Sequence, residues 1–571
     1  MKAPLHLTLT ALAAAVLGAC ALLPLVADRD AKAPVLAGYG VVDMAMTTSS
    51  PAARERFEQG MAQAYAFNEA EAVRVFKAAL AQDPDCAMCA WGVAYQLGPN
   101  INATERGDLR EALRYVDYAL SHSGRASERE RALIQALALR YAHRSEARNA
   151  VVFTTLLTAP ACVSGKGGDD DEKPDPLDVA YAERMRELAD RYRDDADIVS
   201  MYAEAEMIAT KGDWWNATTG KPAGRMGEVA DRLEAALMQH PDHTGLNHYL
   251  IHATDALPAA HRAASSADRM ARLAPNSPHL LHMPSHTYVN LGRYADANRV
   301  NQQALAADES LAAELGKQGF SVSKDWRGHN SHFLWYAALM EGRGDMALET
   351  ARASASRSKG DHEIAEITRS RPLVTLLRLE RWDAVLHEPM PTGDKGMARL
   401  MGRYAQGVAL ARTGQVDAAE KLLAQVEPDA LAMIKSHPSR KYFDIVPRGV
   451  AEVALERLKA EVAFAQGKVD DALAHQTKSI AAGKDIDEFE PPLLAAGSRV
   501  VLGDMQMKAG RWAEAERSFR ADLVNHPRSG WALRGVAQAL EAQGRREEAR
   551  APREQLNTAW SNADAALVAM K

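Results

Sequence analysis

The chain has 571 residues, of which 47% are hydrophobic and 25% charged, a composition typical of globular proteins that excludes a largely disordered chain. This length is more than one hydrophobic core usually supports. The formal net charge is −7 and no long basic run occurs, so we expect no nucleic-acid partner.

Residues 1–20 have the features of an export signal. Lys2 precedes an apolar stretch over residues 5–19, which ends in Leu17-Gly18-Ala19-Cys20. This string resembles the cleavage site of a bacterial lipoprotein, at which the cysteine becomes lipidated. The apolar stretch is too short to predict a membrane span. We therefore predict a lipid anchor on Cys20 that attaches the protein to a membrane of a bacterial cell envelope, facing the periplasm.

Two other interpretations of the N-terminus stay open. The signal is either an ordinary secretory peptide or an uncleaved anchor, and residues 22–26 prolong the apolar run in favour of the second. All three interpretations export the rest of the chain. Residues 21–50 are then expected to be a linker before the folded part.

Beside Cys20, the chain has three cysteines. In an oxidising compartment Cys86 and Cys89 are close enough in sequence to form a local disulfide. Cys162 lies in a polar insertion rich in Gly and Asp and is expected to be a loop thiol. Four cysteines allow several pairings, so it is equally open that all are unpaired. A redox-active role for the Cys-x-x-Cys element at a helix start is a further alternative.

A repeated signal along the chain predicts an all-α fold. Aromatic residues make up only 6%, while Ala and Leu are abundant, which favours helices over strands. A Gly followed five residues later by an Ala recurs between amphipathic segments, at Gly292/Ala297, Gly342/Ala347, Gly414/Ala419, Gly467/Ala472, Gly510/Ala515 and Gly544/Ala549. The Gly ends one helix, and the Ala lets the next helix pack closely on it.

The spacing of these signals identifies the repeat type. Gly510 and Gly544 lie 34 residues apart, as do Pro241 and Pro275, and 34 residues is the tetratricopeptide period. We expect a superhelical solenoid of roughly nine to twelve helix-turn-helix pairs. The predicted division is an N-terminal solenoid over residues 51–375 and a C-terminal solenoid over residues 376–571.

The histidines are concentrated in one part of the predicted N-terminal solenoid. Ten of the 18 fall between His240 and His332, where random scatter would place about three. Six form pairs with helical spacing, which places each pair on one helix face: His248/His252, His282/His286 and His329/His332.

The repeat register relates these pairs to one another. With units that begin at Thr244 and Pro278, His248 and His252 correspond to His282 and His286. With a 16-residue insertion in the next unit, His329 corresponds to His279, His332 to His282, and Tyr336 takes the place of His286. In this repeat type such positions face the concave groove, so three successive first helices are expected to direct histidines into one space.

Convergent imidazoles are typical of a transition-metal site. Two His at i and i+4 can both bind one ion, and imidazole suits copper and zinc among other metals. We predict His248, His252, His282, His286, His329 and His332 as ligands of one or two ions, with Asp255, Glu204 and Glu206 as possible carboxylate partners. The alternative is a scaffold without metal, whose groove binds a peptide or a partner protein through these polar side chains.

Several strings resemble an uncharacterised family of large tetratricopeptide-repeat proteins. They are Cys86-Ala87-Met88-Cys89-Ala90-Trp91-Gly92, Gly98-Pro99-Asn100-Ile101-Asn102, Asn247-His248-Tyr249-Leu250-Ile251-His252, His279-Leu280-Leu281-His282-Met283-Pro284-Ser285-His286 and His329-Asn330-Ser331-His332-Phe333-Leu334-Trp335. The resemblance spans about residues 55–360 and implies the repeat fold, but the family supplies no settled activity. Ala90 and Trp326-Arg327-Gly328 depart from the family pattern, which leaves the histidines intact and puts the rim of the groove in doubt.

No catalytic residues can be assigned from sequence motifs. The chain has no Gly-rich phosphate loop, no Gly-x-Ser-x-Gly elbow and no His-Glu-x-x-His string. A dinuclear copper or zinc enzyme is therefore one form of the metal hypothesis, in which the ions bind oxygen or activate water.

Overall fold

The structure is a computed structural model, and it describes residues 28–102, 109–141 and 174–569, apart from short gaps at 211, 213, 217–218, 324, 361, 439–441, 488 and 495–496. The predicted signal with Cys20 and the predicted loop thiol Cys162 lie outside the described residues. None of the helices in the described part combines the length and the hydropathy that a membrane span needs.

The described residues form helices, with one isolated antiparallel bridge between Trp215 and Pro222. The first half contains α2 (Pro51–Tyr65), α3 (Glu69–Gln82), α4 (Ala87–Leu97), α5 (Arg110–His122), α6 (Glu128–Leu139), α7 (Pro176–Arg191), α8 (Ala196–Thr210), α9 (Met226–Gln239), α10 (Thr244–Ala253), α11 (Ala264–Leu273), α12 (Pro278–His282), α13 (Pro284–Asn290) and α14 (Tyr294–Lys317).

The second half continues in the same manner. It contains α15 (Arg327–Glu341), α16 (Gly344–Arg357), α17 (Glu363–Arg378), α18 (Trp382–His387), α19 (Met397–Arg412), α20 (Val416–Ser436), α21 (Tyr442–Ala465), α22 (Val469–Asp487), α23 (Ser498–Lys508), α24 (Trp512–Asn525), α25 (Gly530–Ala542), α26 (Arg546–Ala559) and α27 (Ala565–Val568). Consecutive helices from α2 to α26 pack as helix-turn-helix pairs, with α12 and α13 acting together as one broken helix. The protein is an all-α solenoid of the tetratricopeptide type, as predicted.

The Gly and Ala positions behave as the repeat signal predicts. All six turn glycines have positive φ angles, from 68° at Gly292 to 81° at Gly342, a conformation that other residues adopt only with strain. The Ala five residues after each of them is at most 1% exposed. A small side chain is therefore required where the second helix of each pair approaches the first.

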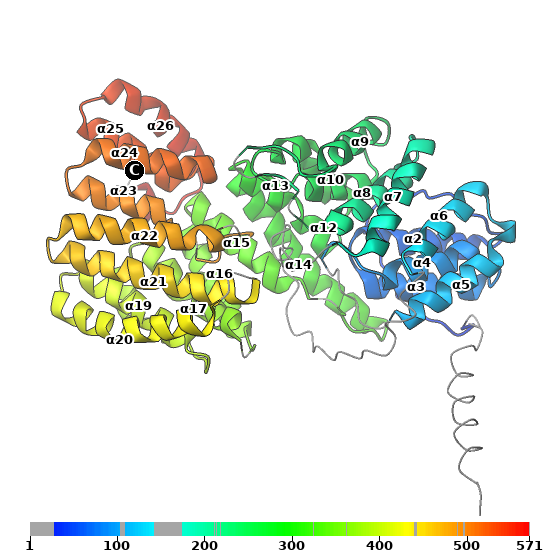
Figure 1. Ribbon diagram of the computed structural model, residues 1–571, viewed down its shortest axis with the longest axis horizontal. Helices are drawn as coiled ribbons and strands as arrows, with labels where there is room; N and C mark the ends of the chain where they lie inside the picture. The colour runs from blue at the N-terminus through cyan, green and yellow to red at the C-terminus, as the bar shows by residue number, and fades with distance from the viewer. Residues whose placement is uncertain are drawn as a thin grey trace, which may run out of the picture.

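Two large hydrophobic cores and two small clusters organise the described residues, and Figure 1 shows the two lobes side by side. The first extends from Tyr39 to Ala337 and the second from Tyr294 to Leu567, so the two overlap along α14 and α15. The division predicted at residue 375 stays a prediction, because the cores meet without marking a boundary there.

The second lobe curls back on itself. Trp531 on α25 donates its indole N–H to the carbonyl of Leu339 at 2.9 Å, and Trp560 at the end of α26 donates to the carbonyl of Met340 at 3.1 Å. Both carbonyls belong to the last turn of α15, and the two indole rings meet edge to face with centroids 5.0 Å apart. The last repeats are thereby fixed to the first helix of the lobe.

This closure predicts that a larger side chain at Gly530 destabilises the fold. A Cβ at Gly530 would lie 2.1 Å from the indole nitrogen of Trp560, and the fully buried ring has no room to yield. Gly530→Ala should therefore lower the free energy of unfolding by at least about 1 kcal/mol, measured by urea denaturation. Gly316→Ala is the matched control, because nothing lies within 4 Å of a Cβ there. Equal stability of the two variants would contradict the tight docking of α25 on Trp560.

Residues 28–50, the expected linker, run along the first lobe. The amide of Val41 donates to the Thr244 hydroxyl at 2.7 Å, the Asn276 side chain donates to the carbonyl of Ala37 at 2.9 Å, and Gln318 bonds both backbone groups of Val35. Tyr39, Met44 and Met46 are at most 5% exposed. This segment is thus part of the folded lobe.

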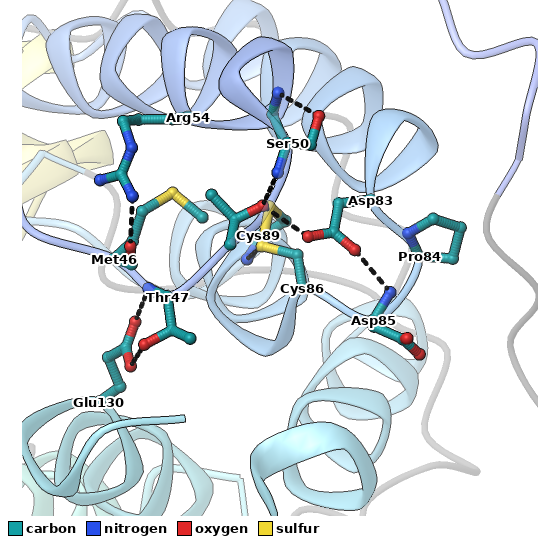
Figure 2. The surroundings of a disulfide bond; sticks show 12 residues. Met46, Thr47, Ser50, Arg54, Asp83, Pro84, Asp85, Cys86, Cys89 and Glu130 are labelled. Atoms are coloured by element: carbon teal, nitrogen blue, oxygen red, sulfur yellow. Dashed lines mark hydrogen bonds between the residues drawn. A yellow bond between two sulfur atoms is a disulfide. The ribbon is translucent and has the colours of Figure 1, made fainter. Parts of the chain in front are cut away.

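The end of the same segment packs beside a disulfide, which the structure forms between Cys86 and Cys89 (Figure 2). Cys86 is the N-cap residue of α4, so the bond spans the first turn of that helix. Close by, the Thr48 hydroxyl donates to Asp83 and the Thr47 hydroxyl donates to Glu130 at 2.6 Å. The half-cystines are at most 1% exposed, which places them in the core of the first lobe.

Candidate metal centre

The structure brings five of the six predicted histidines together and adds a sixth, His279. They form two groups of three whose ligand nitrogens lie within 4.8 Å of one another, His248/His252/His279 and His282/His286/His329. We call these the first and the second triad. His248 and His252 lie on α10, His279 and His282 on α12, His286 on α13 and His329 on α15. The triads adjoin, since the rings of His279 and His282 have centroids 6.4 Å apart.

The nitrogen atoms of each triad point at one another. In the first triad, Nε2 of His248 lies 3.1 Å from Nε2 of His252 and 3.1 Å from Nε2 of His279. In the second, Nε2 of His282 lies 3.0 Å from Nε2 of His286. Two nitrogens bound to one tetrahedral ion at about 2.0–2.1 Å would be about 3.3 Å apart. The observed spacing is close to what shared coordination requires.

The groups behind the rings decide where their protons lie. His282 Nδ1 lies 2.7 Å from Oδ1 of Asn301, whose amide nitrogen is already engaged in donating to the carbonyl of Ala297. His282 therefore donates through Nδ1 to that oxygen. In the first triad, His248 Nδ1 donates to the carbonyl of Tyr65 at 2.7 Å. In each neutral ring this leaves Nε2 with a lone pair directed into its triad.

His286 is held in the same way by carboxylates. Its Nδ1 lies 2.7 Å from Oδ2 of Asp255 and 3.2 Å from Oε2 of Glu490. When His286 donates its Nδ1 proton to an ionised carboxylate, its Nε2 lone pair faces that of His282, an arrangement that a cation between the two nitrogens would stabilise. Histidine ligands of metals characteristically donate their second N–H to a carboxylate or carbonyl oxygen. The second triad has this outer shell complete for two of its three rings.

Burial favours the uncharged form of four of the triad histidines. It lowers the pKa of His248 to about 3 and holds the pKa values of His252, His282 and His329 well below the ordinary value. The rings are at most 9% exposed, so they do not line an open groove as the sequence predicted. Neutral imidazole is the form that binds a metal ion, and the lobe therefore presents ligands that need no deprotonation.

Burial raises the pKa of the nearby carboxyl groups, whereas it lowers the pKa of the histidines. Burial raises the pKa of Asp255 to about 7, and burial together with the charge of Asp255 raises that of Glu490 to about 8. A positive ion in the second triad would act against these shifts and favour the ionised carboxylates. The acidic pair is thus suited to a site with positive charge next to it.

The two triads are built by the same rule. Each takes two histidines one turn apart from one repeat and a third from the first helix of the next repeat. His279 completes the first triad as His329 completes the second, and these two residues correspond in the repeat register. The register thus contained the signal for His279, which the list of expected ligands left out.

His332 belongs to neither triad. Its ring is 8% exposed and contacts Trp335, with centroids 5.6 Å apart. The nearby guanidinium of Arg371 adds to burial in holding the pKa of His332 well below its ordinary value. The partner position one turn on is Tyr336, and a cationic side chain already lies beside the ring. A third triad is therefore not formed in this repeat.

The three carboxylates expected as partners of the metal have different neighbours. Asp255 stands behind His286, but Glu204 accepts a hydrogen bond from the hydroxyl of Tyr95, and Glu206 pairs with Arg225 at 2.8 Å. Sequence analysis missed Glu490, which comes from the loop after α22. No local pattern connects a residue that is 204 positions away with His286.

Comparison with known proteins adds little to this geometry. No family model matches the chain, and no curated protein matches it. Among solved structures, the human IFIT1 dimer with m7Gppp-AAAA is similar over 80% of this chain and 86% of that chain, at 11% identity and a TM-score of 0.30. The APC/C hetero-tetramer Cut9-Hcn1 is similar over 91% and 89%, at 11% identity and a TM-score of 0.21. Likeness at these values carries no argument about function.

Proposed function

We propose that this protein is an exported metal-binding solenoid that holds one transition-metal ion in each of its two histidine triads. The observation that carries the proposal is the pair of Nε2 atoms of His282 and His286, which face each other at 3.0 Å while their Nδ1 atoms are occupied by oxygen acceptors. An ion between these two nitrogens would be bound by both of them.

The ligand set favours copper or zinc. Imidazole nitrogen binds both ions well, and no cysteine belongs to either triad. Three protein ligands leave a coordination position open, which is the arrangement of catalytic rather than structural zinc sites. A metalloenzyme that uses this position to activate water or bind oxygen is the finer form of the proposal.

The experiment is metal analysis of protein purified without chelator or affinity tag. The proposal expects about two equivalents of copper or zinc per chain. Less than about 0.2 equivalents, after incubation with either ion and removal of the excess, would leave the triads as hydrogen-bonded structural histidines.

A peptide-binding scaffold without metal is less well supported by the polar groups of the first lobe. Thr244, Asn276 and Gln318 are the side chains that bind an extended backbone, and they already bind residues 35–41 of the chain itself. The histidines, for their part, are buried and turned towards one another. Neither group is available to a peptide in this arrangement.

Export with a lipid anchor is part of the proposal and has its own test. Replacing Cys20 by Ser should move the protein from the membrane fraction to the soluble periplasmic fraction, because the acylated thiol is absent. Fractionation followed by immunoblotting measures this, and mass spectrometry of the mature N-terminus should show acyl chains on the unaltered protein only. A Cys20→Ser variant that stays in the membrane would favour the uncleaved anchor instead.

A further inference from the structure

A cleft of about 490 Å³ opens beside the second triad. Its walls come from both lobes: α13 and α15 contribute one side, and the loop after α22 together with the end of α24 contributes another. Clefts that bind small molecules usually have volumes of about 300–1,000 Å³ and lie where two structural units meet. The cleft has the size and the position of a ligand site.

The floor of the cleft touches the candidate metal centre. His286 and Asp255 both line it, and Phe333 lines it while packing against the rings of His282 and His286, with centroids 4.7 and 4.5 Å apart. Oxygen atoms of Asp255 and Glu490 lie 2.7 and 3.2 Å from Nδ1 of His286, and Asp255 also accepts from Asn290 at 3.1 Å. The carboxylates are thus engaged with the protein rather than directed to a ligand.

The remaining lining groups are flat aromatic rings and cations. Trp215 and Phe489 are half-buried, and Tyr336 is buried, all with atoms on the cleft. Lys484 and Arg499 also line it; Lys484 is exposed, and Arg499 lies close enough to the buried carboxyl of Asp522 to interact with its charge. Aromatic walls favour a flat apolar ligand body, and two cations on the same cleft favour a negatively charged group on that ligand.

We propose that this cleft binds a small aromatic molecule that carries a negatively charged group, with the charge on Lys484 and Arg499 and the ring between the aromatic side chains. The part of the proposal that places this molecule next to a metal ion rests on the proposed function. The cleft itself does not, because residues of the chain line it without any bound ion. The ligand is the substrate or effector expected for the second metal site.

The experiment uses benzoate as the probe and the full-length protein, both chelated and loaded with cobalt. Isothermal titration or ligand-observed magnetic resonance should show saturable benzoate binding to the chelated protein. Acetate, which lacks the ring, and benzylamine, which has the opposite charge, should each bind at least about tenfold more weakly. Benzoate should also shift the visible absorption of cobalt in the loaded protein, because His286 contacts the cleft.

Variants separate the cleft from the overall fold. Arg499→Gln should weaken benzoate binding at least about tenfold, since a charge-assisted hydrogen bond is lost, and Trp215→Leu should weaken it through loss of the ring contact. Lys468→Gln removes an exposed cation just before α22, outside the cleft, and should leave the affinity unchanged. Circular dichroism of each variant verifies the helical fold.

The outcomes distinguish the two proposals. Failure of benzoate to bind at millimolar concentration, equal binding of benzylamine, or an Arg499→Gln variant with unchanged affinity would each overturn the cleft proposal, even if both triads hold metal. Benzoate that binds in the predicted order to a protein that takes up no metal would support the cleft and overturn the proposed function.

Discussion

Replacing His286 by Ala should leave about one bound ion per chain where the unaltered protein holds about two, because the second triad loses one of its three ligands. His252→Ala should remove the other ion by the same argument in the first triad. Each variant should therefore lose a different one of the two ions. Metal analysis after equilibration with a limiting metal buffer measures this loss directly. The double variant should retain none.

The same variants should lose thermal stability. An ion that binds only the folded protein adds about 4 kcal/mol to the free energy of unfolding when its free concentration is a thousand times Kd. Chelation should therefore lower the melting temperature of the unaltered protein and have a smaller effect on each single variant. The residual effect in His286→Ala then reports the first triad alone.

His332→Ala is the matched control for these variants. It removes a buried histidine from the same helix as His329, but from outside both triads. It should bind as much metal as the unaltered protein, and chelation should lower its melting temperature by as much. If His332→Ala loses metal as His286→Ala does, the ion is not held by the triads as the structure arranges them.

The repeat fold follows from the sequence because its determinants are local. Gly342 with a φ of 81° and a fully buried Ala347 together define the turn and the close approach of a helix pair, and both lie within six residues. The same local signal recurs along the chain with a known period. Each helix pair needs only its neighbours for packing, so a correct period predicts most of the architecture.

Contacts between distant segments have no such local signal. The bonds that hold residues 35–41 to Thr244, Asn276 and Gln318 depend on how the superhelix places three repeats beside an extended chain. The return of Trp531 and Trp560 to α15 depends on the curvature summed over all repeats of the second lobe. Sequence periodicity gives the order of the repeats but not this curvature.

The histidine centre could be predicted only in part, because it depends both on the local repeat signal and on contacts between distant segments. The register predicted that helices of successive repeats direct histidines towards one another, and the triads follow that rule. It did not predict that the rings are buried, because the aromatic side chains that cover them, Phe67 on the first triad and Phe333 on the second, come from other helices and loops. Glu490 completes the surroundings of His286 only because the two lobes meet at this point.

Asn301 offers a test of why the Nε2 atoms face each other. Its Oδ1 accepts the Nδ1 proton of His282 at 2.7 Å, and this keeps the lone pair of that ring on Nε2, inside the triad. In Asn301→Leu the acceptor is lost, so the ring proton is free to move to Nε2 and compete with the metal. Loss of such an outer partner typically weakens metal affinity by about 10–100-fold.

Asn301→Asp provides the rescue, because a carboxylate oxygen at the same position accepts the proton at least as well as the amide oxygen. The expected result is that competition with a chromogenic chelator shows the second ion weakened by about 10–100-fold in Asn301→Leu and close to normal in Asn301→Asp. The first ion should be unchanged in both variants, since His248 is oriented by the carbonyl of Tyr65, which neither substitution alters. Equal weakening in the two variants would mean that Asn301 acts by packing, and that the direction of the His282 proton does not govern metal binding.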